Sequence, residues 1–190
     1  FEAARDYGTE DRFLEYCSTS KITYPGAGVA AMAASEANIA WTKKLMGVQA
    51  IGPDKINQLR HVRYFKDLAG IEAHMEKHAA ILKPKFDLVL SLLEERLGGT
   101  GAGCWHSPNG GYFISFDAMP GCARRINALC KDAGVVMTGA GATFPYGIDP
   151  QDSNLRIAPS LPPVDELRAA AEVFCTCALL AAVEKRLETL

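Results

Sequence analysis

The sequence predicts a protein of mixed strands and helices, in which a small α+β domain is joined through one long helix to a piece of a different layer. Three observations predict this fold. Two short apolar runs come first, a helical pattern follows at 71–97, and strand-like and helix-like segments then mix without strict βαβ repetition. The 190 residues are 48% hydrophobic and 22% charged, which is typical of a globular chain that buries a sizeable core.

The two apolar runs indicate strands on either side of a turn that contains a lysine. "RFLEYCS" at 12–18 predicts a strand that ends at Ser-Thr-Ser-Lys, and "GVAAMAAS" at 28–35 predicts a second, buried run of small residues. Lys21 therefore lies in a connection that leaves a strand. A rigid scaffold often holds binding and catalytic groups at such positions.

Two helices are predicted after the second run. The first begins at Ser35, a capping residue, carries Glu36 in its first turn and stops at Gly47. The second occupies 52–67 and has Pro53 at an early helical position, where the missing N–H of proline costs nothing.

The longest helix is predicted at 71–97, where apolar residues form a stripe. Pro84 in its middle predicts a kink or an interruption. The glycines of "GGTGAG" at 98–103 stop this helix and form a flexible loop. A phosphate-binding loop is not indicated, because no Lys-Ser or Lys-Thr follows and no helix opens there.

The rest of the chain mixes strands with helices, as in an α+β domain. The predicted strands are "GGYFISFD", "VVMT" and "NLRIAPS", and the predicted helices are "GCARRINALCKDAG" and the C-terminal segment that begins near Pro163.

Charge and composition exclude several classes of partner. A net charge of −2 gives no field that favours nucleic acid or anionic lipid, so we expect no nucleic-acid partner. No apolar run reaches the ~18 residues that a membrane span requires. The cysteines lack the spacing of a disulfide framework and predict free, buried thiols in a reducing cytosol, hence a cytoplasmic protein. They are Cys17, Cys104, Cys122, Cys130, Cys175 and Cys177.

Histidines do not indicate a metal site or a hydrolytic triad. His74 and His78, four residues apart on the long helix, could share a metal, but the pattern suggests no third ligand. His61 and His106 have no evident serine or cysteine partner. We therefore expect no metal.

Lys21 is the first candidate for chemistry. An amine must be unprotonated when it attacks a carbonyl, and a desolvated site beside apolar strands favours the neutral form. Ser18 and Ser20 could donate hydrogen bonds to an anion, and Gly26 and Gly28 allow a bound group to approach the backbone. Pyridoxal 5'-phosphate combines an aldehyde with a phosphate and would use the amine and the hydroxyls together.

Arg156 is the second candidate. It lies in the apolar strand "NLRIAPS", where an arginine is costly unless it is paired. Its guanidinium suits bidentate binding of a substrate carboxylate, and a structural ion pair is the alternative. Together with Lys21, this residue makes an amino-acid site plausible.

Five ordered segments carry a resemblance to a known family: "STSKITYPGAGVA", "KINQLRHV", "HSPNGGYFISFD", "GATFPYG" and "NLRIAPS". They resemble the C-terminal half of fold-type I pyridoxal-phosphate aminotransferases, and within these the aspartate or alanine-glyoxylate aminotransferase branch. The resemblance implies the α/β fold of the type I PLP transferases. The end of the large αβα domain would lie at 1–65, and the interdomain helix with the small α+β domain at 66–190.

The resemblance also implies roles for four residues. Lys21 would be the Schiff-base lysine that holds pyridoxal 5'-phosphate and carries the proton of the 1,3-shift. Ser18 would bind the phosphate, with Ser20 a weaker candidate, and Arg156 would bind the substrate α-carboxylate. The implied substrates are an aspartate- or alanine-type amino acid and 2-oxoglutarate or a similar 2-oxo acid. The implied assembly is a homodimer.

Two departures from the family limit this transfer. Many relatives have a phosphate-binding arginine shortly after the lysine, where this chain has Gly28. Family members are also roughly twice as long, so we expect the chain to be a C-terminal half that is inactive alone. Two alternatives stay open, namely another PLP-dependent reaction such as a lyase or decarboxylase on the same fold, or a ligand-sensing domain of a transcriptional regulator.

Overall fold

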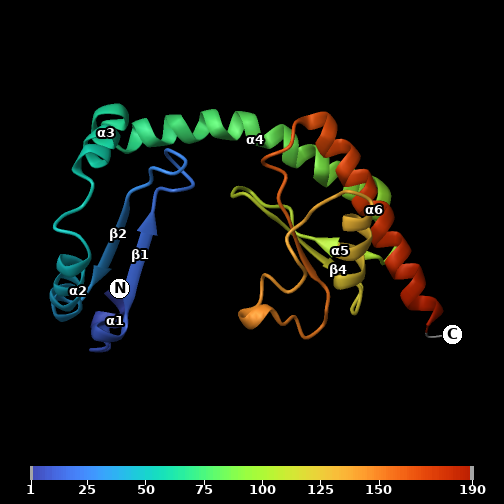
Figure 1. Ribbon diagram of the computed structural model, residues 1–190, viewed down its shortest axis with the longest axis horizontal. Helices are drawn as coiled ribbons and strands as arrows, with labels where there is room; N and C mark the ends of the chain where they lie inside the picture. Colours follow the sequence, from blue (N-terminus) through green and yellow to red (C-terminus); the bar gives the residue numbers. More distant parts are fainter. Residues whose placement is uncertain (1, 189–190) are drawn as a thin grey trace. The chain divides into compact units, whose positions relative to one another are not determined.

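The computed structural model describes residues 2–188. The chain divides between Ala79 and Ala80 into two compact units, which are described separately. The first unit contains α1 (Glu2–Asp6), the 3-10 helix η1 (Glu10–Arg12), β1 (Leu14–Ser18), β2 (Ala30–Ala34), α2 (Glu36–Gln49), α3 (Lys55–Phe65) and the start of α4 (Leu68–Leu97) (Figure 1). The second contains the rest of α4, β3 (Gly103–Trp105), β4 (Ile114–Ala118), α5 (Ala123–Asp132), the 3-10 helix η2 (Pro145–Gly147), β5 (Asn154–Ile157) and α6 (Val164–Leu187).

The predicted strand before Lys21 is confirmed as β1, which pairs antiparallel with β2 from Leu14 opposite Ala34 to Ser18 opposite Ala30. The expectation that the second run is buried is wrong, because β2 has no buried residue and all of β1 is exposed. The reason is the small size of this sheet. In the described part of the chain it consists of these two strands alone.

The first two predicted helices form, and side chains cap both. Asn38 N–H donates to Ser35 Oγ (3.3 Å) at the start of α2, which confirms the predicted cap. The helix passes through Gly47, the predicted stop, because one glycine costs a helix only about 1 kcal/mol. At the start of α3, the Asp54 carboxylate accepts from Asn57 N–H (2.9 Å).

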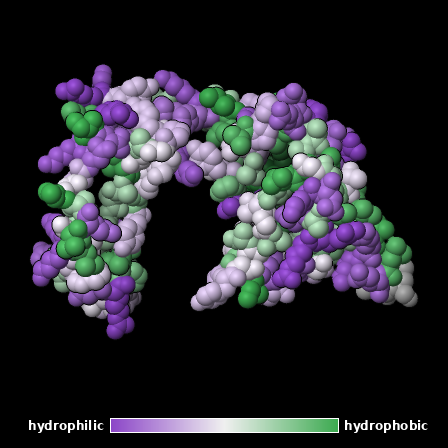
Figure 2. Space-filling view, viewed as in Figure 1, coloured by the Kyte–Doolittle hydropathy of each residue, from purple (hydrophilic) through white to green (hydrophobic). Residues whose placement is uncertain are grey.

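Helices α2 and α3 expose many apolar side chains. Figure 2 shows apolar atoms, in green, at the surface over these two helices. Surfaces of this kind commonly contact another segment or another chain. The exposed residues include Trp41, Leu45, Met46, Val48, Ile56, Leu59 and Val62.

Helix α4 is continuous, so the interruption predicted at Pro84 does not occur. Its C-terminal half buries one face, on which Val89, Leu93 and Leu97 are almost fully enclosed. The spacing of four residues keeps these side chains in line. The helix ends at Leu97, and the φ angle of 72° at Gly99 needs a glycine, which confirms the predicted helix stop.

The second unit is built on an antiparallel sheet in the order β3-β4-β5. Along β4, buried and exposed residues alternate, so one face of the sheet carries the core and the other faces solvent. The C-terminal half of α4, α5 and α6 supply the rest of that core. Its most enclosed side chains include Leu93, Ile114, Phe116, Ile126, Leu155 and Cys175.

One sequence prediction for this unit is wrong, and one strand was not predicted. "VVMT" at 135–138 is not a strand, although Val135 and Met137 pack against the core. The strand β3 begins at Gly103, the last residue of the predicted glycine loop, and Gly103 to Trp105 pair with the end of β4.

All six cysteines are free, but only four are buried, whereas Cys17 and Cys104 are exposed. Burial raises the pKa of Cys130 to about 12 and that of Cys175 to about 11. These two thiols therefore stay protonated at neutral pH and act as small apolar groups in the core.

Within residues 2–188 no helix has the length and apolar character to cross a membrane. The domain boundary expected at residue 65 stays a prediction, because α4 runs through the division between the two units.

Candidate active site

The turn that carries Lys21 is closed by Thr19. Thr19 N–H donates to the Val29 carbonyl (2.8 Å), and Val29 N–H donates to Thr19 Oγ1 (2.8 Å). The Thr19 carbonyl accepts from the N–H groups of Ile22 and Thr23, both at 2.9 Å. The loop between β1 and β2 thus has a closed base, and the exposed Lys21 stands in its first turn.

Three of the four predicted site residues lie together on this turn. Ser18 ends β1, and its Oγ lies 2.7 Å from Ser20 Oγ. Ser20 N–H also donates to Ser18 Oγ (3.2 Å). Both serines are exposed, as is Lys21. Two hydroxyls and an amine within four residues form a polar surface that suits an anion with a carbonyl group.

The surroundings of Gly28 explain why this position holds a glycine and not the arginine expected from the resemblance. A Cβ at this position would lie 2.6 Å from Ser20 Oγ and 2.9 Å from Ser20 Cα. No side chain fits there unless the Ser20 backbone moves, so an arginine has no room. The Ser20 hydroxyl lies where the side chain of the arginine expected from the resemblance would begin.

The loop after Lys21 is fastened to α3 and α4 by contacts that sequence reasoning missed. Thr23 is only 3% exposed, and its Oγ1 lies 2.8 Å from His61 Nε2. Tyr24 contacts the rings of His61 at 5.1 Å and Phe65 at 5.4 Å, centroid to centroid. Burial raises the pKa of Tyr24, and the nearby Tyr64 adds to this rise. No local spacing pattern in the sequence links Thr23 to His61, which lies 38 positions away.

His74 of the predicted histidine pair packs against the same aromatic side chains, Tyr24 and Phe65. Its ring centroid lies 5.1 Å from that of Phe65, and its Nε2 lies 3.4 Å from the Thr23 carbonyl oxygen. His78 is its neighbour, at 4.4 Å between ring centroids. Within the described chain, these contacts give His74 a packing role.

Arg156, in the second unit, points to the open face of its sheet. It lies opposite Ser115, while its neighbours Leu155 and Ile157 face the core. The guanidinium lies over the Phe113 ring (4.4 Å from Cζ to the centroid) and donates from Nη2 to Thr138 Oγ1 (3.4 Å).

The guanidinium of Arg156 is able to bind an anion. Its Nε is buried and has no hydrogen-bond partner among the described residues. No carboxylate of residues 2–188 forms an ion pair with it, so the structural ion pair considered above is not found there. A carboxylate of a ligand would satisfy this guanidinium.

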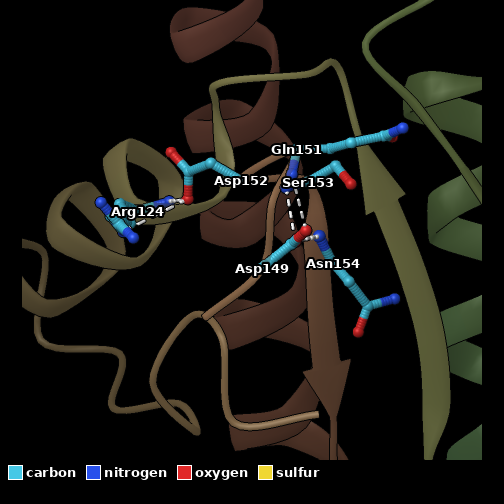
Figure 3. A network of polar contacts seen from close by, with 6 residues as sticks. All are labelled: Arg124, Asp149, Gln151, Asp152, Ser153 and Asn154. Carbon is cyan, nitrogen blue, oxygen red and sulfur yellow. Dashed lines mark hydrogen bonds and ion pairs between the residues drawn. The ribbon is translucent and has the colours of Figure 1, made fainter. Parts of the chain in front are cut away.

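The Asp149 side chain fixes the start of the strand that carries Arg156 (Figure 3). Its carboxylate accepts from the N–H groups of Gln151 (2.9 Å), Ser153 (2.8 Å) and Asn154 (2.8 Å). The bond from Asn154 is the largest of the effects that hold the pKa of Asp149 below its ordinary value, and burial of the side chain opposes it. Sequence reasoning missed this residue, although Asp before a turn is a common signal for such bonds.

Replacing Asp149 with asparagine is expected to lower the thermal midpoint by several degrees near neutral pH. The amide keeps one oxygen and turns an NH2 group toward backbone donors. Because the folded pKa is lowered, the carboxylate stabilises the fold above about pH 4, and this contribution is lost as pH falls through the folded pKa. The difference between wild type and Asp149→Asn should therefore shrink toward about pH 3.

Thermal unfolding followed by circular dichroism at several pH values measures this difference. Asp87→Asn is the control, since Asp87 forms only an exposed ion pair with Lys83 on α4. A difference for Asp149→Asn that stays constant from about pH 7 to about pH 3 would contradict the prediction.

Comparisons with known proteins identify the family to which the chain is similar. The family model described as "Aspartate amino-transferase" matches residues 1–189. An aspartate aminotransferase of Corynebacterium glutamicum is 51% identical over 177 residues, which is 93% of this chain and 41% of that protein. The crystal structure of an aspartate transaminase from the same organism matches with a TM-score of 0.92 and 49% identity. This match covers 97% of the chain and 43% of that structure.

A more distant structure supports the fold alone. LysN, an α-aminoadipate aminotransferase of Thermus thermophilus, matches with a TM-score of 0.75 at 17% identity, over 96% of this chain and 46% of its own. The fold class expected for the aminotransferases is thus confirmed, and the chain spans about two fifths of the length of the curated relatives it matches. With a family model that covers nearly every residue, the chain belongs to the aspartate aminotransferase family.

Proposed function

We propose that the complete protein containing this chain is a PLP-dependent aminotransferase. It would move the amino group of an aspartate- or alanine-type donor to 2-oxoglutarate or a similar 2-oxo acid. The observation that carries this proposal is the placement of the Lys21 amine on one turn with the Ser18–Ser20 hydroxyl pair. Family membership supports it.

The residues of the turn fit pyridoxal 5'-phosphate. Lys21 supplies an amine for its aldehyde, and the two hydroxyls, 2.7 Å apart, supply donors for its phosphate. Gly28 leaves the space that the Ser20 hydroxyl occupies, so phosphate binding would use this hydroxyl in place of the arginine expected from the resemblance. When bound, the cofactor supplies an electron sink for the charge that develops at the substrate α-carbon.

Each residue then has a defined task. Lys21 Nζ would hold the aldehyde carbon and later, once it is released, hold the proton taken from the α-carbon. Ser18 and Ser20 orient the phosphate. Arg156 binds the α-carboxylate with its two-pronged guanidinium, which Phe113 supports from below.

A homodimer and a cytoplasmic location complete the proposal. The apolar residues exposed on α2 and α3 suit a partner subunit or another segment of the complete protein. Free thiols, four of them buried, suit a reducing compartment.

Borohydride reduction of the complete protein with its cofactor, followed by peptide mapping, tests this proposal. The label is expected on Lys21, and a label on any other lysine would overturn the assignment. A panel of amino donors then tests the reaction type. Aspartate or alanine should convert the cofactor to its amine form with release of a 2-oxo acid, whereas release of carbon dioxide or ammonia would identify a decarboxylase or a lyase.

Replacing Gly28 with alanine is expected to weaken PLP binding by about tenfold, the equivalent of one hydrogen bond to a charged group. The new Cβ would displace Ser20 from its place beside Ser18. The dissociation constant of PLP from the apoprotein measures this effect. Gly47→Ala is the control, because nothing lies within 4 Å of a Cβ there. Equal affinities for both variants would contradict the prediction.

A further inference from the structure

His61 lies on α3, outside the turn, yet it is linked to the turn by two hydrogen bonds. Its Nδ1 lies 2.9 Å from the Asn57 carbonyl oxygen. A carbonyl oxygen can only accept, so Nδ1 carries a proton. The other ring nitrogen, Nε2, lies 2.8 Å from Thr23 Oγ1. The Asn57 carbonyl thus orients the ring, and Nε2 faces Thr23, which lies two positions after Lys21.

This link does not depend on the protonation state of the ring. When the imidazole is neutral, the Thr23 hydroxyl donates to Nε2. When it is charged, Nε2 donates to Thr23, whose own proton can go to the Thr19 carbonyl oxygen at 3.2 Å. Either arrangement joins α3 to Thr19, the residue that closes the base of the loop.

Asn57, one helical turn before His61, holds the other limb of the same loop. Its Nδ2 donates to the carbonyl oxygens of Ala27 (2.8 Å) and Gly28 (3.4 Å). Two side chains on one face of α3 therefore hold both limbs of the loop that carries Lys21, one at Thr23 and the other at Ala27 and Gly28. The contacts at Thr23 and Asn57 are largely shielded from water, which strengthens them.

We propose that His61 is a positioning residue which, together with Asn57, keeps the Lys21 turn in the geometry that reaction with the cofactor requires. The proposal rests on the proposed role of Lys21. Loosening a reacting group by about 1 Å can lower a rate by about 100-fold, although the group itself is unchanged. The hydrogen bonds to α3 restrict this movement.

Four variants of the complete protein test the proposal. His61→Leu and Thr23→Val remove the bond while they keep similar volumes, whereas His61→Gln and Thr23→Ser keep a polar group that can form it. Thr176→Val is the matched control, because it removes a threonine hydroxyl on α6 that bonds only to the Glu172 carbonyl of its own helix.

The first measurement is amide hydrogen exchange of the peptide 19–29 in the apoprotein. His61→Leu and Thr23→Val should exchange about tenfold faster there, and the two polar variants and the control should match wild type. The second measurement is the rate at which the apoprotein captures PLP. This rate should fall about tenfold in the same two variants, and kcat should fall about as much while KM stays within about twofold.

The outcomes separate this proposal from the proposed function. Unchanged exchange of 19–29 in Thr23→Val, or equal capture rates for Thr23→Val and Thr23→Ser, would overturn the positioning role. The positioning role would also be overturned if the thermal midpoint falls while the exchange of 19–29 and the rate of PLP capture stay unchanged. If borohydride labels another lysine, the proposed function fails, but the exchange result still shows whether His61 and Thr23 hold the turn.

Discussion

Replacing Lys21 with alanine is expected to lower kcat of the complete protein by roughly 1000-fold or more. The variant loses the amine that would hold the cofactor aldehyde and the atom that would carry the α-proton. Lys21 is exposed, so its removal should leave the thermal midpoint of the apoprotein almost unchanged. Single-turnover rates with aspartate and with a 2-oxo acid, each followed by cofactor absorbance, measure both halves of the reaction.

Lys44→Ala provides the matched control, because Lys44 is an exposed lysine on α2 away from the turn. Its rates should equal those of wild type. Added methylamine should recover part of the activity of Lys21→Ala, since it offers another proton acceptor. Retention of more than about one tenth of the wild-type rate without added amine would contradict the assigned role of Lys21.

Replacing Arg156 with lysine is expected to lower kcat/KM for the amino donor by about 100-fold, mostly through KM. The charge is kept, but the planar fork that can bind two carboxylate oxygens is lost. The flat contact with Phe113, 4.4 Å from Cζ to the ring centroid, is lost as well. Steady-state kinetics over a range of donor concentrations measure the change.

Arg125→Lys is the control, because Arg125 also makes a two-pronged contact, but with Glu184 of the protein itself (2.7 and 2.9 Å). That ion pair is exposed to solvent and lies within the protein itself, so KM should not change. If Arg156→Lys keeps the wild-type KM while kcat falls, Arg156 acts in a step other than binding of the carboxylate.

Local patterns in the sequence identified the strand before Lys21, the helix stop before Gly99 and the strand around Arg156. Each depends on residues that are neighbours in the chain, such as alternation along a strand or glycine after a helix. The burial of β2 was not predictable in this way. Small apolar residues are typical of an enclosed strand, but enclosure depends on which other segments cover it.

The contacts that fasten the Lys21 turn could not be predicted from spacing. Thr23 and His61 lie 38 positions apart, and neither residue belongs to a motif that couples threonine with histidine. The ion pair considered for Arg156 is not found among residues 2–188 for a related reason. Its cost was argued from an apolar strand, whereas the pleat directs Arg156 to the open face and Leu155 to the core.

The exposed β1–β2 pair also determines how this chain behaves in solution when it is produced by itself. Two strands without a covered face form a marginal unit, and their free edges offer unpaired N–H and C=O groups to other molecules. The alanine-rich run of β2 carries no charge between Ala30 and Ala34 that would oppose stacking of one copy on another. When the chain is produced by itself, we therefore expect copies to aggregate through the edges of this strand pair at high concentration.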